Sequence, residues 1–276
     1  MTSKMRDSIA IAMQDPVNLN QIRSALTGTR FASHLQHFGS IPSTNTALLE
    51  AAANGAPEGT VYIADEQTAG RGRGGHTWHS APADGLYLSA LVKPSLQLRD
   101  ALLLSLATGL AAQAAIRSTT SLSIDLRWPN DLLLDGHKLG GILAETAVES
   151  GAAASLRYAV IGIGINLNHA SFPPELATLA TSLRLATGQL QSRTALLIAL
   201  LRALDFELTQ LEAQHPDLLA RFTAASTWVR GKPVHVPEQG GYTGLTAGLD
   251  NRGFLLVTTG DGTTRTVLSG GVREAL

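Results

Sequence analysis

The chain has 276 residues, 44% of them hydrophobic, which is enough for one large domain with a smaller module beside it. A formal net charge of -1 excludes a whole-chain electrostatic attraction to nucleic acid or to an anionic membrane. The absence of cysteine excludes a disulfide framework, a thiolate zinc site and a cysteine nucleophile.

No segment has the pattern of a signal peptide or of a membrane span. The apolar patch near the N-terminus is interrupted by Asp7 and Asp15, and no small-residue cleavage site follows it. The most apolar stretch, Ala101 to Ile116, is too short and too broken by polar residues to cross a bilayer. We therefore expect a soluble, cytoplasmic protein, in which residues 1–30 form an N-terminal extension without an assigned role.

The first strong local pattern is a helix followed directly by a strand. Ser43 or Thr44 can cap the helix, and Asn54 with Gly55 can end it, because these two residue types tolerate a left-handed backbone. The strand follows at residues 60–66.

The middle of the chain predicts a mixed sheet with a buried helix. Residues 98–117 are apolar around most of a helix circumference, which is typical of a buried helix. The strand candidates are residues 86–94, 123–128, 132–135, 138–148 and 155–167. Tight turns between them favour antiparallel or mixed pairing over a doubly wound parallel sheet. A helix from Thr194 to Glu212 closes this large α+β domain.

After Trp228 the pattern changes to short strands with frequent glycine. This pattern is typical of a small β-barrel of the size of an SH3-like module. The predicted organisation is therefore a large domain at 31–228 and a small β domain at 229–276.

The most unusual local chemistry is the glycine-arginine segment at residues 70–75. Four glycines among six residues are costly to order, but they expose backbone N–H groups and allow a ligand to approach closely. Arg71 and Arg73 supply planar cations suited to phosphate and carboxylate oxygens. The segment predicts an anion-binding loop that is mobile when empty. An exposed linker, or a tract that contacts RNA nonspecifically, explains it as well.

Three further segments carry polar groups at the ends of strands or helices. Residues 127–131 read RWPND, and Lys138 opens a strand that holds the pair Gly140-Gly141, a pattern that marks close approach of a ligand or of another backbone. Residues 162–166 read GIGIN, whose asparagine can bond an adenine edge or cap a turn. Ser43-Thr44-Asn45 is either an anion-favouring helix start or a plain cap.

In this order the segments resemble the biotin protein ligase family. The matching motifs are STN at 43–45, Glu66-Gln67 with AGRGR at 69–73 and Trp78, WPND at 128–131, KLGGIL at 138–143 and GIGIN at 162–166. The resemblance implies a mixed-sheet catalytic domain, similar to lipoate ligases and class II aminoacyl-tRNA synthetases, with an SH3-like C-terminal domain. It also implies formation of biotinyl-5'-AMP from biotin and ATP, followed by transfer of biotin to a lysine.

The resemblance also implies roles for individual residues. The biotin-binding set is Ser43, Thr44, Asn45, Gln67, Gly70, Arg71, Gly72, Arg73, Lys138 and Gly141. The nucleotide-binding set is Arg71, Arg73, Trp78, Asn130, Lys138 and Asn166. The catalytic residues would be Lys138, Arg73 and Arg71, whose positive charges offset the negative charge of the reacting oxygens. Mg²⁺ is expected on phosphate oxygens and waters, so no residue is named as its ligand.

The resemblance has two departures. Arg127 stands where the family usually has lysine, and His76 stands where an arginine is frequent.

The expected acceptor is the biotin carboxyl carrier protein of acetyl-CoA carboxylase. We expect no nucleic-acid partner, and the choice between monomer and homodimer stays open.

Two alternatives on the same fold remain: a lipoate or octanoate ligase, and a bifunctional ligase and repressor. We expect no repressor function, because only about forty residues precede Ser43, too few for a winged helix-turn-helix.

Overall fold

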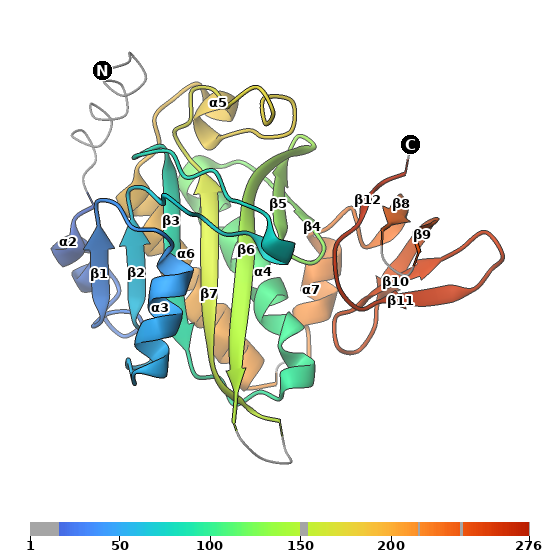
Figure 1. The fold of residues 1–276 in the computed structure, drawn as a ribbon, viewed down its shortest axis with the longest axis horizontal. Helices are drawn as coiled ribbons and strands as arrows, with labels where there is room; N and C mark the ends of the chain where they lie inside the picture. Colours follow the sequence, from blue (N-terminus) through green and yellow to red (C-terminus); the bar gives the residue numbers. More distant parts are fainter. Residues whose placement is uncertain (1–16, 150–153, 215, 238–239, 276) are drawn as a thin grey trace.

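The computed structural model describes residues 17–149, 154–214, 216–237 and 240–275, which form a large α+β domain and a small β domain (Figure 1). The large sheet has the strand order β1-β2-β3-β7-β6-β5-β4. The strands are β1 (Leu35–Phe38), β2 (Val61–Ala64), β3 (Gly85–Val92), β4 (Asp125–Arg127), β5 (Asp131–Leu134), β6 (His137–Val148) and β7 (Leu156–Asn166). β1 and β2 pair in parallel and every other pair is antiparallel, which confirms the mixed sheet.

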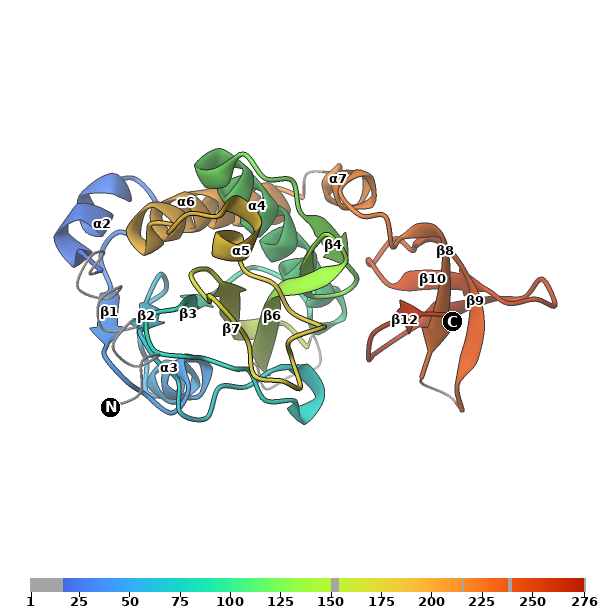
Figure 2. The ribbon, with the colours of Figure 1, turned by 90° about the horizontal axis from the view of Figure 1, so that it is seen from above.

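The helices lie on both faces of this sheet (Figure 2). One face carries α2 (Leu19–Ala25), α4 (Leu102–Thr120), α6 (Arg193–Glu212) and α7 (Leu218–Ala224), and α3 (Thr44–Ala53) covers the other. The short α5 (Leu183–Thr187) lies beyond the ends of the strands, and single 3-10 turns occur at Arg73–Gly75 and Leu98–Asp100.

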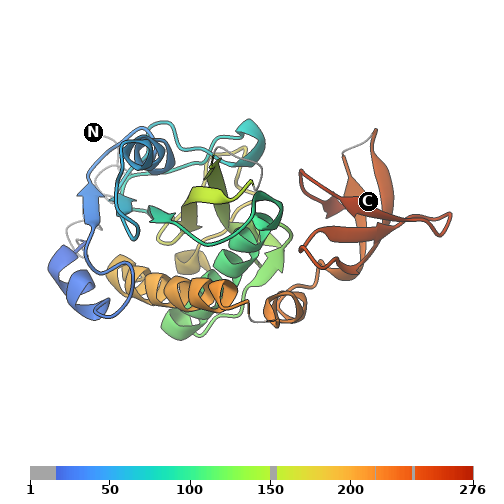
Figure 3. The ribbon, with the colours of Figure 1, turned by 90° about the horizontal axis from the view of Figure 1, so that it is seen from below.

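The helix α4 is the apolar element predicted to be buried. With the 3-10 turn before it, it is long and apolar enough to span a membrane, but it packs against α6 along its length (Figure 3). Leu104, Leu106, Ala111 and Ile116 are fully buried in the core beneath the sheet. Its apolar composition is therefore that of a core helix.

The helix α3 begins and ends where its capping residues predict. Ser43 is its N-cap, in extended backbone, and the Ser43 Oγ accepts from the Thr46 N–H at 3.4 Å. Asn54 ends the helix, followed by Gly55 at φ 91°. The helix N-terminus is thus held against the sheet, where Ser43, Thr44 and Asn45 are all buried.

The described part of the predicted N-terminal extension packs onto the large domain. Ile22 and Leu26 are fully buried in the main core. Arg30 forms ion pairs with Asp205 at 2.9 Å and with Glu212 at 2.8 Å, both on α6. In the described residues the large domain therefore starts before residue 31, while residues 1–16 of the predicted extension lie outside the described residues.

The small domain is a five-stranded antiparallel sheet in the order β11-β10-β9-β8-β12. The strands are β8 (Arg230–Val236), β9 (Tyr242–Leu249), β10 (Leu255–Thr258), β11 (Thr264–Val267) and β12 (Arg273–Glu274). Trp128 joins it to the large domain by donating its Nε1–H to the Gly253 carbonyl at 2.8 Å. Arg127 adds to this junction by lying 5.2 Å from the ring centre of Trp228.

Candidate functional site

A cavity lies over the middle of the large sheet, between the start of α3 and the glycine-arginine segment. Its walls come from β3, β6 and β7 and from the loop at residues 67–78. It is lined by Ser43, Thr44, Asn45, Gln67, Arg71, Gly72, Arg73, Trp78, Leu88, Ser89, Asn130, Lys138, Gly141, Ile142, Leu143, Gly162, Ile163 and Gly164. Of the residues predicted for the site, Gly70 and Asn166 are outside this lining.

Uncharged polar side chains meet at the α3 side of the cavity. Gln67 Oε1 accepts from the Thr44 N–H at 2.9 Å and from the Thr44 hydroxyl at 3.0 Å. This fixes the Gln67 amide, whose Nε2 donates to Ser80 Oγ at 3.0 Å. A backbone N–H, which can only donate, thus sets which end of the glutamine faces which neighbour.

Ser89 belongs to this group, although sequence reasoning missed it. It is fully buried in β3, and its hydroxyl lies 2.8 Å from Thr44 Oγ1 and 2.7 Å from Asn45 Oδ1. The available sequence signal was a single serine among the mostly apolar residues of that strand. Ser43, Thr44, Asn45, Gln67 and Ser89 are called the polar set below.

The glycine-arginine segment forms a hairpin over the cavity. The Trp78 N–H donates to the Gly70 carbonyl at 2.9 Å, and the Gly72 N–H donates to the His76 carbonyl at 2.7 Å. Gly74 and Gly75 have φ values of 67° and 80°, in the left-handed region that favours glycine. The glycines therefore build the turn, and Gly70 contributes to its base.

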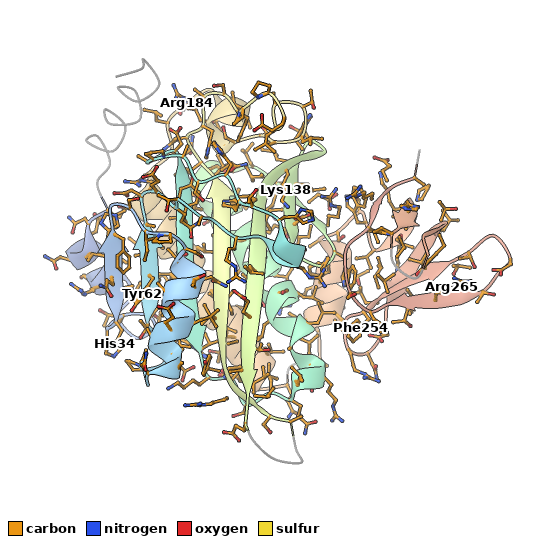
Figure 4. All side chains as sticks on the ribbon, viewed as in Figure 1. His34, Tyr62, Lys138, Arg184, Phe254 and Arg265 are labelled. Atoms are coloured by element: carbon orange, nitrogen blue, oxygen red, sulfur yellow. The ribbon has the colours of Figure 1, made fainter. Side chains whose placement is uncertain are left out.

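Three cations face the cavity, each with a partner in the protein. Arg71 pairs with Glu145 at 2.9 Å, and Arg73 donates through Nη1 to the Gly270 carbonyl of the small domain. Lys138, at the end of β6 that lies near α5 (Figure 4), pairs with Asp131 at 2.6 Å. Arg71, Arg73 and Lys138 are called the cationic set below.

The carboxylate of Asp131 is shared by two cations. Arg127 contacts Oδ2 at 2.6 Å while Lys138 contacts Oδ1. Burial acts to raise the pKa of Asp131, but the charges of Lys138 and Arg127 outweigh it and hold that pKa below its usual value. The arginine that departs from the usual family residue therefore keeps an ion pair at the cavity edge.

Trp78 lies on a floor of glycines contributed by β6 and β7. A Cβ at Gly164 would lie 2.5 Å from Trp78 Nε1, and one at Gly141 would lie 3.5 Å from the Trp78 ring. Lys138 Nζ is 5.7 Å from the centre of the same ring. The paired glycines of KLGG and GIGI thus make room for a large aromatic side chain, as glycines within strands often do.

Two predicted nucleotide contacts have structural partners in this conformation. Asn166 is 4% exposed, and its Nδ2 donates to the carbonyls of Lys138 and Thr181. Asn130 lines the cavity, but its Nδ2 donates to the Ile142 carbonyl at 2.9 Å. Contact of Asn166 with adenine stays a prediction.

Comparisons with known proteins agree with this architecture. Residues 38–166 match the biotin/lipoate A/B protein ligase family, and residues 230–272 match the biotin protein ligase C-terminal domain. The biotin–[acetyl-CoA-carboxylase] ligase of Mycobacterium tuberculosis is 34% identical over 94% of this chain and 96% of its own. The bifunctional ligase/repressor BirA of Bacillus spizizenii is 33% identical over 88% of this chain and 75% of its own.

Solved structures give the same result. A biotin protein ligase from Aquifex aeolicus in complex with biotin and ATP superimposes with a TM-score of 0.75 at 30% identity, covering 88% of this chain and all of that one. A Leishmania major biotin protein ligase shares the fold, with a TM-score of 0.58 at 22% identity over 86% of this chain and 99% of its own.

Proposed function

Because the chain belongs to the biotin protein ligase family, we propose that its cavity binds biotin and ATP side by side and joins them. The enzyme forms biotinyl-5'-AMP from biotin and ATP, and then transfers biotin to a lysine of a carrier protein. In the first step a carboxylate oxygen of biotin attacks the α-phosphorus of ATP and pyrophosphate leaves. In the second step the lysine amine attacks the acyl carbon and AMP leaves.

The observation that carries this proposal is the division of the cavity into two chemistries. The polar set is uncharged and largely buried, which suits the mostly apolar bicyclic head of biotin with its single urea group. The cationic set lies on the loop and on β6, where a carboxylate and a phosphate would have to meet. A ligand that is neutral at one end and anionic at the other fits both groups.

Within this proposal, Ser43, Thr44 and Gln67 hold the urea group through hydrogen bonds. Arg71, Arg73 and Lys138 bring the carboxylate of biotin and the α-phosphate together, and offset the charge that develops on the phosphate oxygens. Trp78 offers an aromatic face to the adenine ring. The hairpin at residues 70–76 covers the adenylate, which protects this reactive anhydride from water until the acceptor arrives.

We further propose that Mg²⁺ enters on the phosphates of ATP. Among the residues that the structure describes, no three histidine or acidic side chains are grouped so as to hold a metal ion. The ion would supply positive charge to the leaving pyrophosphate. Other elements of the proposal are a cytoplasmic location and, as acceptor, the biotin carboxyl carrier protein of acetyl-CoA carboxylase.

Pyrophosphate release from ATP and magnesium tests this function, with biotin, lipoate or octanoate supplied in turn and with or without an apo carrier domain. We expect release that requires biotin, followed by a mass gain of one biotinyl group on the carrier. Release with lipoate or octanoate alone would move the protein to the sister activity, and no release with any acid would overturn the proposal. The relatives from Mycobacterium tuberculosis and Paracoccus denitrificans are named biotin–[acetyl-CoA-carboxylase] ligases, which disfavours the sister activity.

A further inference from the structure

Glu145 on β6 joins the loop over the cavity to the helix beneath it. Its carboxylate accepts from Arg71 through both oxygens, with Nη2 to Oε1 at 2.9 Å and Nη1 to Oε2 at 3.2 Å. The same Oε2 accepts from Asn45 Nδ2 at 2.7 Å. The Glu145 side chain is 25% exposed, so this ion pair is sheltered on the carboxylate side. One acidic residue therefore contacts both the polar set and the cationic set.

Two acceptors fix the direction of these hydrogen bonds. The Glu145 carboxylate and the Leu143 carbonyl can only accept, so the amide nitrogen of Asn45 faces them, and the Ser89 hydroxyl donates to Asn45 Oδ1 at 2.7 Å. A Cβ at Gly162 would lie 2.4 Å from that same Oδ1, so the strand has room for the amide only because residue 162 is a glycine. The Glu145 carboxylate is thus bonded to a buried side chain that Ser89 and Leu143 also hold, and it can act as an anchor for the more exposed Arg71.

A bidentate pair fixes the plane of the guanidinium and not only its distance. Glu145 uses one N–H from each terminal nitrogen of Arg71, and Thr46 Oγ1 accepts from Nη1 at 3.3 Å. Arginine has five N–H donors, so its Nε–H and one Nη2–H meet no acceptor among the contacts of the described residues. These two donors are available to an anionic ligand.

We propose that Glu145 is a positioning residue, which holds Arg71 over the cavity so that its remaining donors meet the adenylate. This inference rests on the proposed function. The carboxylate does not touch the reacting atoms, and it acts through Arg71 alone. Its removal by Glu145→Gln keeps an oxygen for Asn45 while it breaks the ion pair. Arg71 then loses its fixed orientation, and the bound adenylate loses an ordered cation.

The first test measures the hairpin in the empty protein, with trypsin as the probe, because trypsin cleaves after arginine in chain that is free to move. We expect Glu145→Gln to speed cleavage after Arg71 about tenfold, since about 1.4 kcal/mol of ion-pair stabilisation corresponds to that factor. Glu149→Gln, an exposed glutamate just beyond β6, is the matched control and should leave the rate unchanged. Equal rates for Glu145→Gln and wild type would overturn the proposal.

The second test is a double-mutant cycle on the rate at which bound biotinyl-5'-AMP dissociates. With Arg71 present, Glu145→Gln should raise this rate about tenfold, while the affinity for biotin changes less than about threefold. In the Arg71→Ala background the same substitution should change the dissociation rate less than about twofold. An equal effect in both backgrounds would show that Glu145 acts through Asn45 or through the fold, and would overturn the proposal.

The two tests separate this inference from the function on which it rests. If wild-type protein forms no adenylate, the proposed function fails, while the trypsin experiment still decides whether Glu145 holds Arg71. If adenylate forms and the cycle shows no coupling, the function stands and the positioning role fails.

Discussion

Lys138 lines the cavity while it is paired with the carboxylate of Asp131, and this ion pair affects how its charge acts on a ligand. Asp131 also pairs with Arg127, so its single negative charge is shared between the two cations. The group of three keeps one net positive charge beside Trp78 and the glycine floor. An anion that approaches Lys138 therefore meets a cation whose position is fixed and whose charge is not cancelled.

Replacing Lys138 by alanine should abolish most of the adenylation activity. Loss of one preorganised charge at a developing oxyanion typically costs about 100-fold to 1,000-fold in rate, and we expect the same range for pyrophosphate release. Lys93→Ala removes an exposed lysine at the end of β3 and serves as the control. If Lys138→Ala kept both the adenylation rate and adenylate retention, the assignment of this lysine would be wrong.

His169 makes the stability of the protein depend on pH between about 4 and 6.5. It is 1% exposed and stacks on Phe172 with ring centres 5.0 Å apart. Burial, aided by the nearby His79, lowers the pKa of His169 from 6.5 to about 4. The unfolded chain binds this proton near pH 6.5 and the folded chain does not, so acidification between these values favours unfolding.

We therefore expect the free energy of unfolding to fall by about 3 kcal/mol between pH 6.5 and pH 4, and to be unaffected by this group above pH 6.5. Urea unfolding measured across this range checks the slope. His169→Phe, which keeps an aromatic ring against Phe172, should flatten it, whereas His34→Gln at an exposed histidine should not. A slope that survives in His169→Phe would assign the effect to other groups.

Several residues of the site could be predicted one at a time, but their contacts could not. Short motifs identified Lys138 and both arginines, because their residue types suit anions wherever they lie. Ser89 was missed although it is a lone serine in a mostly apolar strand, and Glu145 was missed because an acid within a strand gains meaning only from partners far away in sequence. Glu145 is 100 residues from Asn45 and 74 from Arg71, so only the folded sheet brings them together.

At the scale of elements, β7 carries two glycines with separate tasks. Gly162 makes room for the amide of Asn45, and Gly164 makes room for the indole of Trp78. They lie two residues apart, so both face the cavity side of the sheet, as the alternation of a strand requires. One strand thus supports the proposed biotin contacts and the proposed nucleotide contacts at adjacent positions.

Replacing each glycine by alanine should therefore weaken the binding of a different substrate. Gly164→Ala displaces Trp78 and should raise the KM for ATP about tenfold, in line with the loss of an aromatic stack. Gly162→Ala displaces Asn45 and should weaken biotin binding about fivefold, in line with one lost hydrogen bond. Steady-state kinetics with each substrate varied in turn measures both effects. Gly39→Ala, where a Cβ meets nothing within 4 Å, is the control. Equal effects on both substrates would contradict this separation.

The elements themselves were the most predictable part of the fold. Alternation and caps located α3, α4, α6 and the strands β2 to β7, because each depends on neighbours in sequence. The short helices α2, α5 and α7 were not identified, since five to seven residues give too little periodicity. The parallel pairing of β1 with β2 and the placing of β3 beside β7 depend on contacts across the domain, which local pattern does not contain.

At the scale of the whole molecule, the two domains meet close to the site. The turn between β9 and β10 inserts Gly253 against α4 and α7, and the Gly253 carbonyl accepts from Trp128. The small domain also reaches the hairpin, where Arg73 donates to the Gly270 carbonyl. Sequence composition separated the domains, but it contained no sign that the second domain contacts the loop over the cavity.

This arrangement predicts that a substitution at the domain junction changes how long the adenylate stays bound. Gly253 has a φ of 84°, and a Cβ there would lie 2.7 Å from Leu106 and 3.2 Å from Leu103, so Gly253→Ala adds backbone strain and a collision. Gly262→Ala is a matched control, because its φ is 83° while a Cβ meets nothing within 4 Å. We expect the free energy of unfolding, measured by calorimetry, to fall by about 1 kcal/mol in Gly262→Ala and by about 3 kcal/mol in Gly253→Ala.

Only Gly253→Ala should also shorten the time for which biotinyl-5'-AMP stays bound, because displacing the small domain removes the acceptor that Arg73 uses at Gly270. Adenylate dissociation measured on both variants decides this. If the two variants retained adenylate equally while their stabilities differed, the junction would contribute to folding alone. The contact between Arg73 and the small domain would then have no part in covering the intermediate.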